Sequence, residues 1–400
     1  MIENVANLED LVSSMNSQVI KWRRHLHENP ELSFQETQTA KFVYDTLESF
    51  GNLELSRPTK TSVMARLIGS KKGNVLALRA DMDALPIQEE TNLPFSSKNS
   101  GVMHACGHDG HTAMLLGAAK VLSTIKEHIS GEIRFIFQHA EELIPGGAQE
   151  MVKAGVTEGV NAVIGLHLSS QTPLGRFGII YGPAMAAADT FNVLIKGKGG
   201  HASRPQEAID PVAIAVQLIN SINQFISRKV NPAQRVVLSV TQIQGSNAHN
   251  IIPDTVSFGG SIRTFDPEVR KQIPKWIEQH VKGLTEANEC TYELKHDYGY
   301  SSVVNEQKIT SLVEQTIIEE FGKEQCYHAE PVMGSEDFSA FSNVVPGCFV
   351  FLGAGSENPI ENFPHHHPRF MIREEALEMG VLYYVKTALN YHFAQEYVSQ

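Results

Sequence analysis

The chain has 400 residues, of which 42% are hydrophobic and 20% are charged, as in an ordinary globular protein with more than one domain. Its formal net charge of −12 argues against nucleic-acid and anionic-membrane partners, because both require a basic surface. No run of 18 apolar residues predicts a membrane span, and residues 1–20 lack the apolar core of a signal peptide. The four scattered cysteines predict no disulfide framework, so we expect a cytoplasmic protein.

The first 185 residues predict helices followed by buried strands. Apolar positions at helical spacing indicate helices up to about residue 50. A small-residue stretch at 111–125 indicates a helix that packs on a sheet. Strands flanked by helices favour an α/β layer with a largely buried sheet. The β-rich runs are 62–69, 74–83, 131–142, 162–168 and 175–182.

The pattern changes near residue 186. Six elements then follow in the order βαββαβ, which is typical of the split ferredoxin-like unit. They cover 189–199, 210–226, 235–245, 255–265, 267–287 and 290–300. After about residue 300 the pattern returns to helix and sheet segments. We therefore expect a discontinuous α/β domain, residues 1–185 and 300–400, into which residues 186–299 are inserted as a second domain.

Side chains that bind divalent transition metals lie at or beside the ends of the predicted strands. In an extended segment Cys106 and His108 would face the same way, and Gly107 would permit close backbone approach. His167 is a hydrophilic residue in an apolar strand, where either a metal or a hydrogen bond in the core would satisfy it. His366 lies in a proline-flanked loop, for which a solvated histidine-rich turn is the alternative.

The adjacent residues Glu141 and Glu142 also suit a metal site. Neighbours on a strand point to opposite faces, so both can serve one site only where the strand ends and the backbone turns. Residues 145–147, Pro-Gly-Gly, would supply that turn. One carboxylate could then bind a metal while the other moves protons. The alternative is a pair of solvated glutamates before a turn.

Nearly the whole chain resembles the di-metal aminoacylase/carboxypeptidase peptidase family. It is most similar to the amidohydrolase branch, which includes hippurate hydrolases, N-acyl-amino-acid hydrolases, plant auxin-conjugate hydrolases and N-acetyl-diaminopimelate deacetylases. The motifs that carry the resemblance occur in the family's order. They are RRHLHENPELSFQE (23–36), RADMDALPIQE (79–89), HACGHDGHT (104–112), AEE (140–142), GKGGHASRP (197–205), NIIPD (250–254), GSIRTFD (260–266), MGSEDFS (333–339) and HHPRF (366–370).

The resemblance implies two divalent metal ions and a set of side chains that hold them. The implied ligands are Cys106, His108, Glu142, His167 and His366. Five side chains are few for two ions, so the Cys106 thiolate or a water is expected to bridge them. The choice of His366 among three adjacent histidines rests on its distance from the following proline.

The resemblance also implies roles for residues that do not bind the metals. Glu141 becomes the general base and acid, and Asp83 becomes a carboxylate that orients a ligand, with an ordinary turn or capping aspartate as its alternative. His201 would stabilise the oxyanion from the inserted domain, often that of a partner subunit. Asn250 and Arg263 would face the substrate. Arg263 suits a two-point grip on a carboxylate, although a structural salt bridge is equally compatible.

These features predict a metal-dependent amidohydrolase that cleaves N-acyl-L-amino acids, N-acetyl or benzoyl for example, to a carboxylic acid and an amino acid. Zinc is the expected metal because a thiolate is present, with manganese, cobalt and nickel as alternatives. We expect a homodimer or higher homo-oligomer through the inserted domain, with no nucleic-acid or membrane partner.

Three alternatives stay open at this point. A di- or tripeptidase or carboxypeptidase of the same family would share the chemistry, and a catalytically silent binding protein would share the fold. A thiol-redox protein using Cys106 would need a second cysteine nearby, and none is near in the sequence.

Overall fold

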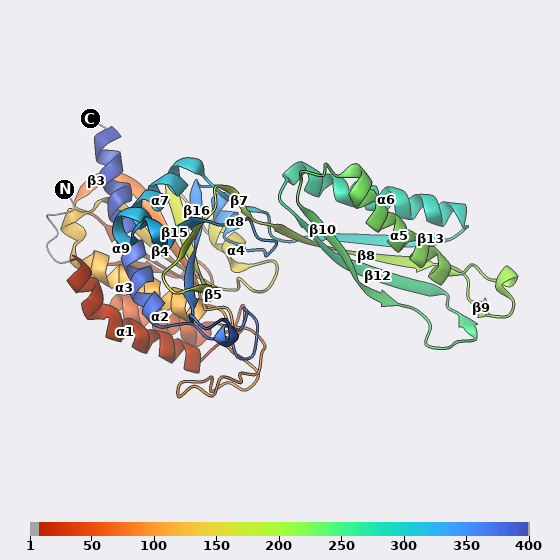
Figure 1. The fold of residues 1–400 in the computed structure, drawn as a ribbon, viewed down its shortest axis with the longest axis horizontal. Helices are drawn as coiled ribbons and strands as arrows, with labels where there is room; N and C mark the ends of the chain where they lie inside the picture. The colour runs from red at the N-terminus through yellow and green to blue at the C-terminus, as the bar shows by residue number, and fades with distance from the viewer. Residues whose placement is uncertain (1–7, 399–400) are drawn as a thin grey trace. The chain divides into compact units, whose positions relative to one another are not determined.

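The computed structural model describes residues 8–398, with side chains described up to residue 393 (Figure 1). Residues 1–7 and 399–400 lie outside the described residues. The first of these ranges belongs to the segment 1–20 that was expected to lack a signal peptide, and both belong to the predicted domain 1–185 and 300–400. The chain divides into two compact units. Unit 1 comprises Met1–Ala184, Val304–Glu330 and Asp337–Gln400, and unit 2 comprises Met185–Val303 and Pro331–Glu336. Within residues 8–398, every helix is too short or too polar to cross a membrane.

Unit 1 contains a mixed sheet of eight strands. The strands are β1 (Glu54–Ser56), β2 (Val63–Ile68), β3 (Lys71–Asp81), β4 (Ser130–Gln138), β5 (Ala162–Pro173), β6 (Phe177–Ile179), β15 (Cys326–His328) and β16 (Gly347–Gly355). Their order in the sheet is β1-β2-β4-β3-β5-β16-β6-β15. The central strands β4, β3, β5 and β16 are parallel to one another, while β1–β2, β2–β4 and β16–β6 pair antiparallel. All nine residues of β4 are buried, so both faces of the sheet are covered there.

Helices cover this sheet, as Figure 1 shows. They are α1 (Leu8–Glu28), α2 (Thr37–Glu48), α3 (His108–Thr124), α4 (Gly147–Lys153), α7 (Gln307–Phe321), α8 (Ser339–Ser342) and α9 (Glu375–Val398), with short 3-10 turns η2 (Lys126–His128), η4 (Lys323–Gln325) and η5 (Pro359–Glu361). Helices α2, α3, α7 and α9 contact the strands, and α1 packs on α3 and α9. Helices α3 and α9 cross closely at Gly380, where a Cβ would lie 1.9 Å from Met114 Sδ and would force that side chain to move.

Unit 2 contains a four-stranded antiparallel sheet with two helices. Its elements are β8 (Ala187–Lys196), β9 (Gly200–His201), η3 (Pro205–Glu207), α5 (Pro211–Lys229), β10 (Val236–Gln244), β11 (Ile251–Ile252), β12 (Thr255–Thr264), α6 (Pro267–Ala287) and β13 (Thr291–Tyr298). The order is β10-β12-β8-β13, and β9 pairs with β11. Separate strands β7 (Gly182–Met185) and β14 (Val303–Asn305) pair where the chain passes from one unit to the other.

The two helices of unit 2 begin in the same way. Asp210 and Asp266 each accept two backbone N–H groups of the first turn, and a proline follows each of them. Burial alternates along β8 and β13, so one face of the sheet packs on α5 and α6, as Figure 1 shows. This face encloses a second hydrophobic core that includes Phe191, Phe258 and Ile277.

Candidate metal centre

The predicted metal ligands all lie in unit 1, around one edge of its sheet. Strands β3, β4 and β5 are parallel, so their carboxyl ends lie on the same side of the sheet. The segments that follow β3 and β4 therefore meet there. Asp83 follows β3, Glu142 follows β4, and His167 lies on β5 itself. Cys106 lies two residues before α3, and His366 lies in the loop before α9.

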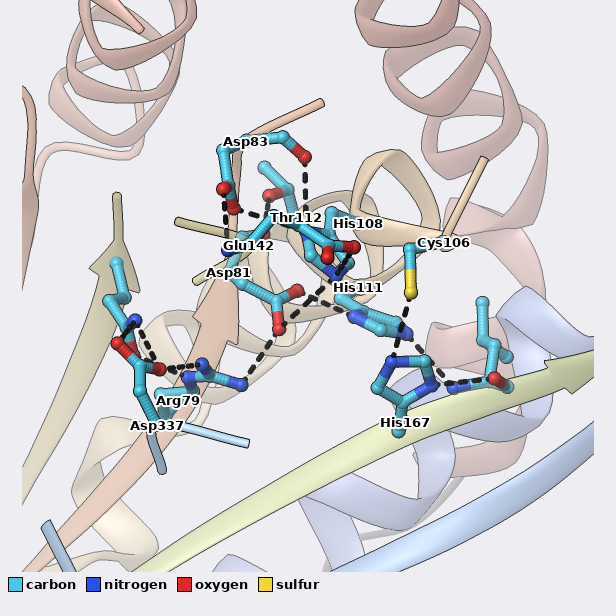
Figure 2. A network of polar contacts seen from close by, with 12 residues as sticks. Arg79, Asp81, Asp83, Cys106, His108, His111, Thr112, Glu142, His167 and Asp337 are labelled. Carbon is cyan, nitrogen blue, oxygen red and sulfur yellow. Dashed lines mark hydrogen bonds and ion pairs between the residues drawn. The ribbon is translucent and has the colours of Figure 1, made fainter. Parts of the chain in front are cut away.

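The predicted extended geometry of Cys106 and His108 is wrong. His108 is the first residue of α3, and Gly107 before it is left-handed, with φ +93°. The two side chains approach each other because the chain turns into the helix at Gly107, a conformation that glycine adopts without strain. Cys106 Sγ then lies 3.5 Å from His167 Nε2 (Figure 2).

The predicted position of the turn after β4 also needs correction. The strand ends at Gln138 rather than running to the glutamates, and Ala140 is left-handed, with φ +50°. The chain therefore changes direction before Glu141 and Glu142, not only at residues 145–147. This earlier turn explains how two neighbouring carboxylates border one site.

Three overlapping groups of potential ligand atoms result, each with all its atoms within 4.8 Å of one another. Their members are Cys106, His108 and His167; Cys106, Glu142 and His366; and His108, Glu141 and Glu142. Together they contain all five predicted ligands and the predicted general base. The structure thus brings these side chains together, and their binding of metal remains a prediction.

The ring of His108 indicates that a cation fits here. Its Nδ1 lies 3.0 Å from the backbone oxygen and 3.2 Å from Oδ1 of Asp83, so Nδ1 carries the donated proton. Its buried Nε2 has no hydrogen bond and faces Glu142 Oε1 at 3.9 Å (Figure 2). An unsatisfied buried nitrogen is unfavourable, and a divalent metal ion would satisfy it.

Concentrated negative charge sets the electrostatics of the centre. Burial would lower the pKa of His108, but Asp81, Asp83 and Glu142 raise it to about 10. Burial, together with Glu142, Glu141 and Asp81, also raises the pKa of the Cys106 thiol well above its usual value. Divalent cations would offset this excess of carboxylate charge.

Asp81 and His111, which the sequence did not indicate, lie beside the predicted ligands. Asp81 Oδ1 lies 2.6 Å from His111 Nδ1, and Asp81 Oδ2 accepts from Arg79 at 2.7 Å (Figure 2). Asp81, His108 and His111 also form a group that could hold an ion. Both ring nitrogens of His111 are already engaged, since Nε2 accepts from the Leu168 N–H at 2.9 Å. His111 therefore suits the task of fixing β5 beside His167.

Two histidines of the run 365–367 border the centre. His366 Nε2 lies 3.1 Å from Glu142 Oε1, while His365 Nδ1 lies 3.5 Å from Cys106 Sγ. His367 stacks on Phe363. This geometry is compatible with the prediction that His366 binds metal. His365 also borders the centre, which its distance from the proline did not indicate.

The sequence model of peptidase family M20/M25/M40 matches residues 77–390. The chain belongs to this family. The chain is accordingly an enzyme that hydrolyses amide bonds. The match includes the metal-centre residues that follow β3, β4 and β5 and the whole of unit 2.

Relatives and solved structures agree with the assignment to M20/M25/M40. The chain is 59% identical over 298 residues, 74% of its length and 80% of the relative's, to an N-acyl-L-amino acid amidohydrolase of Geobacillus stearothermophilus. It is 41% identical to thermostable carboxypeptidase 1 of Saccharolobus solfataricus over 97% of this chain and 98% of that one. A dinuclear metal-binding peptidase of the M20 family from Bacillus subtilis has TM-score 0.83 and 37% identity, covering 96% and 99% of the two chains.

The other predicted site residues of this M20/M25/M40 member lie in unit 2. His201, on β9, is exposed, and its Nδ1 accepts from the Ser203 N–H at 3.1 Å. Asn250 precedes β11 and is exposed. Arg263, on β12, donates to Ser335 Oγ at 2.9 Å and makes no ion pair with any described residue, so the structural salt bridge is not observed. The roles of these three residues remain predictions.

Proposed function

We propose that this enzyme hydrolyses the amide bond of N-acyl-L-amino acids, releasing a carboxylic acid and a free amino acid. The observation that carries the proposal is the gathering of a thiol, imidazoles and two neighbouring carboxylates into groups whose potential ligand atoms lie within 4.8 Å of one another. The similarity to an N-acyl-L-amino acid amidohydrolase, which is 59% identical, supports this substrate class.

Two divalent metal ions would be held by Cys106, His108, Glu142, His167 and His366. Bound there, they would supply Lewis acidity that polarises the scissile carbonyl and makes a water molecule more acidic. Zinc suits a donor set with a thiolate, and manganese, cobalt and nickel remain alternatives. Asp83 would keep the His108 ring in the tautomer whose Nε2 faces the centre.

Glu141 would move the proton that the reaction requires. It is buried beside Glu142, one residue from a predicted ligand and within reach of the same centre. Its carboxylate would take a proton from the attacking water and pass it to the nitrogen of the leaving amino acid. The turn at Ala140, with φ +50°, supports this division of tasks, because it lets both adjacent glutamates border one centre.

Unit 2 would act as the ferredoxin-like lid and dimerisation domain expected for residues 186–299, with residues 1–185 and 300–400 as the catalytic domain. Its βαββαβ order and sheet order β10-β12-β8-β13 support the ferredoxin-like assignment. His201 would donate to the oxyanion of the tetrahedral intermediate. Asn250 and Arg263 would contact the substrate, with the Arg263 guanidinium gripping its carboxylate.

A homodimer through unit 2 is the proposed assembly. Strand β10 lies at the edge of its sheet, and all its residues are exposed or half-buried. An unpaired edge of this kind is stabilised when a second copy covers it. We also place the enzyme in the cytoplasm, where its four free cysteines would stay reduced.

The test is a hydrolysis screen of protein reconstituted with zinc, manganese, cobalt or nickel. Substrates would be N-acetyl-, N-benzoyl- and longer N-acyl-amino acids beside a dipeptide panel, with the released amine as the readout. We expect turnover of acyl-amino acids that a chelator abolishes and metal restores. The similarity to thermostable carboxypeptidase 1 favours a second candidate, a peptidase, and turnover of dipeptides alone would select it. No turnover with any metal would refute both.

A further inference from the structure

The turn that precedes the two glutamates is held from outside. Ala140 has φ +50°, a left-handed conformation that is unfavourable for a residue with a Cβ and persists only when surrounding contacts impose it. Its carbonyl oxygen accepts the N–H of Gly147 at 2.9 Å. Gly147 has no room for a side chain, because a Cβ there would lie 1.9 Å from the His139 oxygen. The carbonyl group of Ala140 is thus fixed by a hydrogen bond within its own loop.

The other side of Ala140 is held by Glu36, more than a hundred residues earlier in the chain. Glu36 Oε1 accepts the Ala140 N–H at 2.7 Å and the Phe34 N–H at 2.9 Å. Phe34 is also left-handed, with φ +66°, and its ring packs edge-on against His139. The Glu36 side chain is fully buried. A single carboxylate oxygen therefore joins two left-handed backbone positions.

Glu36 does not use its side chain to cap its own helix, although it directly precedes α2. That task falls to Glu31, whose carboxylate accepts the N–H groups of Gln38 and Thr39 at 3.2 Å and 2.8 Å. The burial of Glu36 is thus directed at the loop after β4 rather than at the start of α2.

The same N-terminal segment contacts the glutamate loop through a second link. Ser33 Oγ donates to Asp83 Oδ2 at 2.7 Å, and this oxygen also accepts the Glu142 N–H at 3.0 Å. Residues 33–36 consequently act on both residues that flank Glu141: directly on the Ala140 N–H before it, and through Asp83 on the Glu142 N–H after it.

We propose that Glu36 is a positioning residue for the glutamate pair. By holding the Ala140 N–H, it keeps the chain in the left-handed turn that aims Glu141 and Glu142 at one centre. This role rests on the proposed function, in which Glu141 moves the proton and Glu142 binds metal. It also gives a task to the motif PELSFQE, which the predicted ligand set leaves unused.

The test compares Glu36→Ala, which removes the acceptor, with Glu36→Gln, whose amide oxygen can replace Oε1. Each zinc-reconstituted variant would be assayed for kcat and KM on an N-acetyl-amino acid, and for zinc affinity by chelator competition. We expect Glu36→Ala to lower kcat at least 30-fold with KM within threefold, and to weaken zinc binding at least tenfold. Glu36→Gln should stay within threefold of the wild type in all three.

Glu31→Ala is the matched control, because it removes two backbone acceptors at the start of the same helix without touching Ala140. It should lower the melting temperature and leave kcat and zinc affinity unchanged. Wild-type kcat and zinc affinity in Glu36→Ala, or equal losses in Glu36→Ala and Glu36→Gln, would overturn the proposal. If Glu36→Ala does not fold, Glu36→Asp, one methylene too short to reach both N–H groups, replaces it under the same criteria. Wild-type turnover in the same assay tests the proposed function separately.

Discussion

Asp83 connects His108 to Glu142. Its Oδ1 lies 3.2 Å from His108 Nδ1, and its Oδ2 accepts the Glu142 backbone N–H at 3.0 Å. One buried carboxylate thus contacts the ring of a predicted ligand on α3 and the backbone of a predicted ligand in the loop after β4. Two segments that meet only through tertiary structure share this one support.

Replacement of Asp83 by asparagine should weaken metal binding. An amide cannot accept from both His108 and Glu142 with the same geometry, because one of its two positions is an NH₂ donor. We expect a loss of about 10- to 100-fold in zinc affinity, the usual effect of removing a partner of a ligand. Chelator competition would measure it. Ser33→Ala, which removes only the hydroxyl donor to the same carboxylate, is the control and should change the affinity less.

Replacement of Glu141 by glutamine should remove hydrolysis while keeping the metals. The amide cannot accept a proton from water, so we expect kcat to fall by about 10²- to 10⁴-fold. Metal content, measured by elemental analysis, should not change, because Glu142 is untouched. A Glu141→Gln enzyme as active as the wild type would show that the proton passes elsewhere.

Replacement of His201 by alanine should lower kcat with little effect on metal content. If the imidazole donates to the oxyanion, its loss costs about 10²- to 10³-fold in kcat. Ser203→Ala provides the comparison, since Ser203 pairs with His201 Nδ1 and only orients the ring. An unchanged kcat in His201→Ala would remove this residue from the mechanism.

Glu36 should make stability depend on pH in an unusual direction. Burial and the nearby Asp83 raise its pKa from 4.5 to about 7, against the opposing effect of the N–H groups it accepts. Between pH 4.5 and about pH 7, Glu36 keeps its proton in the folded chain and loses it in the unfolded chain. The contribution of Glu36 to the free energy of unfolding is therefore complete below about pH 4.5 and is lost as pH rises through about 7.

The size of this contribution is on the order of 3 kcal/mol, from the pKa difference. Urea unfolding of wild type and Glu36→Gln at pH 5 and pH 8 would measure it. The glutamine variant should lose less stability between the two pH values, by up to about that amount. Parallel pH profiles for the two proteins would contradict the assignment of a raised pKa to Glu36.

Sequence patterns predicted most elements of the fold because their periodicity is strong. Helix 267–287 was predicted with its observed bounds, since Asp266 and Pro267 mark its start. The strand predicted at 131–142 ended too late, because the chain takes a left-handed turn at Ala140, whose N–H donates to Glu36, far away in the sequence. No local pattern indicates an alanine in that conformation.

The sequence predicted the side chains that gather at the candidate site, but not the residues that hold them in place. Cysteine, histidine and glutamate are residue types that bind metals, and the resemblance of their motifs to those of a known family supplied the ligand set. Asp81 and His111 lie within those motifs, but their roles depend on which backbone and side-chain groups surround them after folding. His365 illustrates the same limit, because only the three-dimensional loop shows that it borders Cys106.

Strand β16 lies between β5 and β6, which precede it in the chain by the whole of unit 2. During synthesis the centre of this sheet therefore stays open until residues 347–355 have left the ribosome, and His366 arrives later still. The segment Met185–Val303 is continuous and emerges earlier with its own core. The core of the second unit can therefore form before the first unit is complete, and the residues of the candidate metal centre are the last to come together.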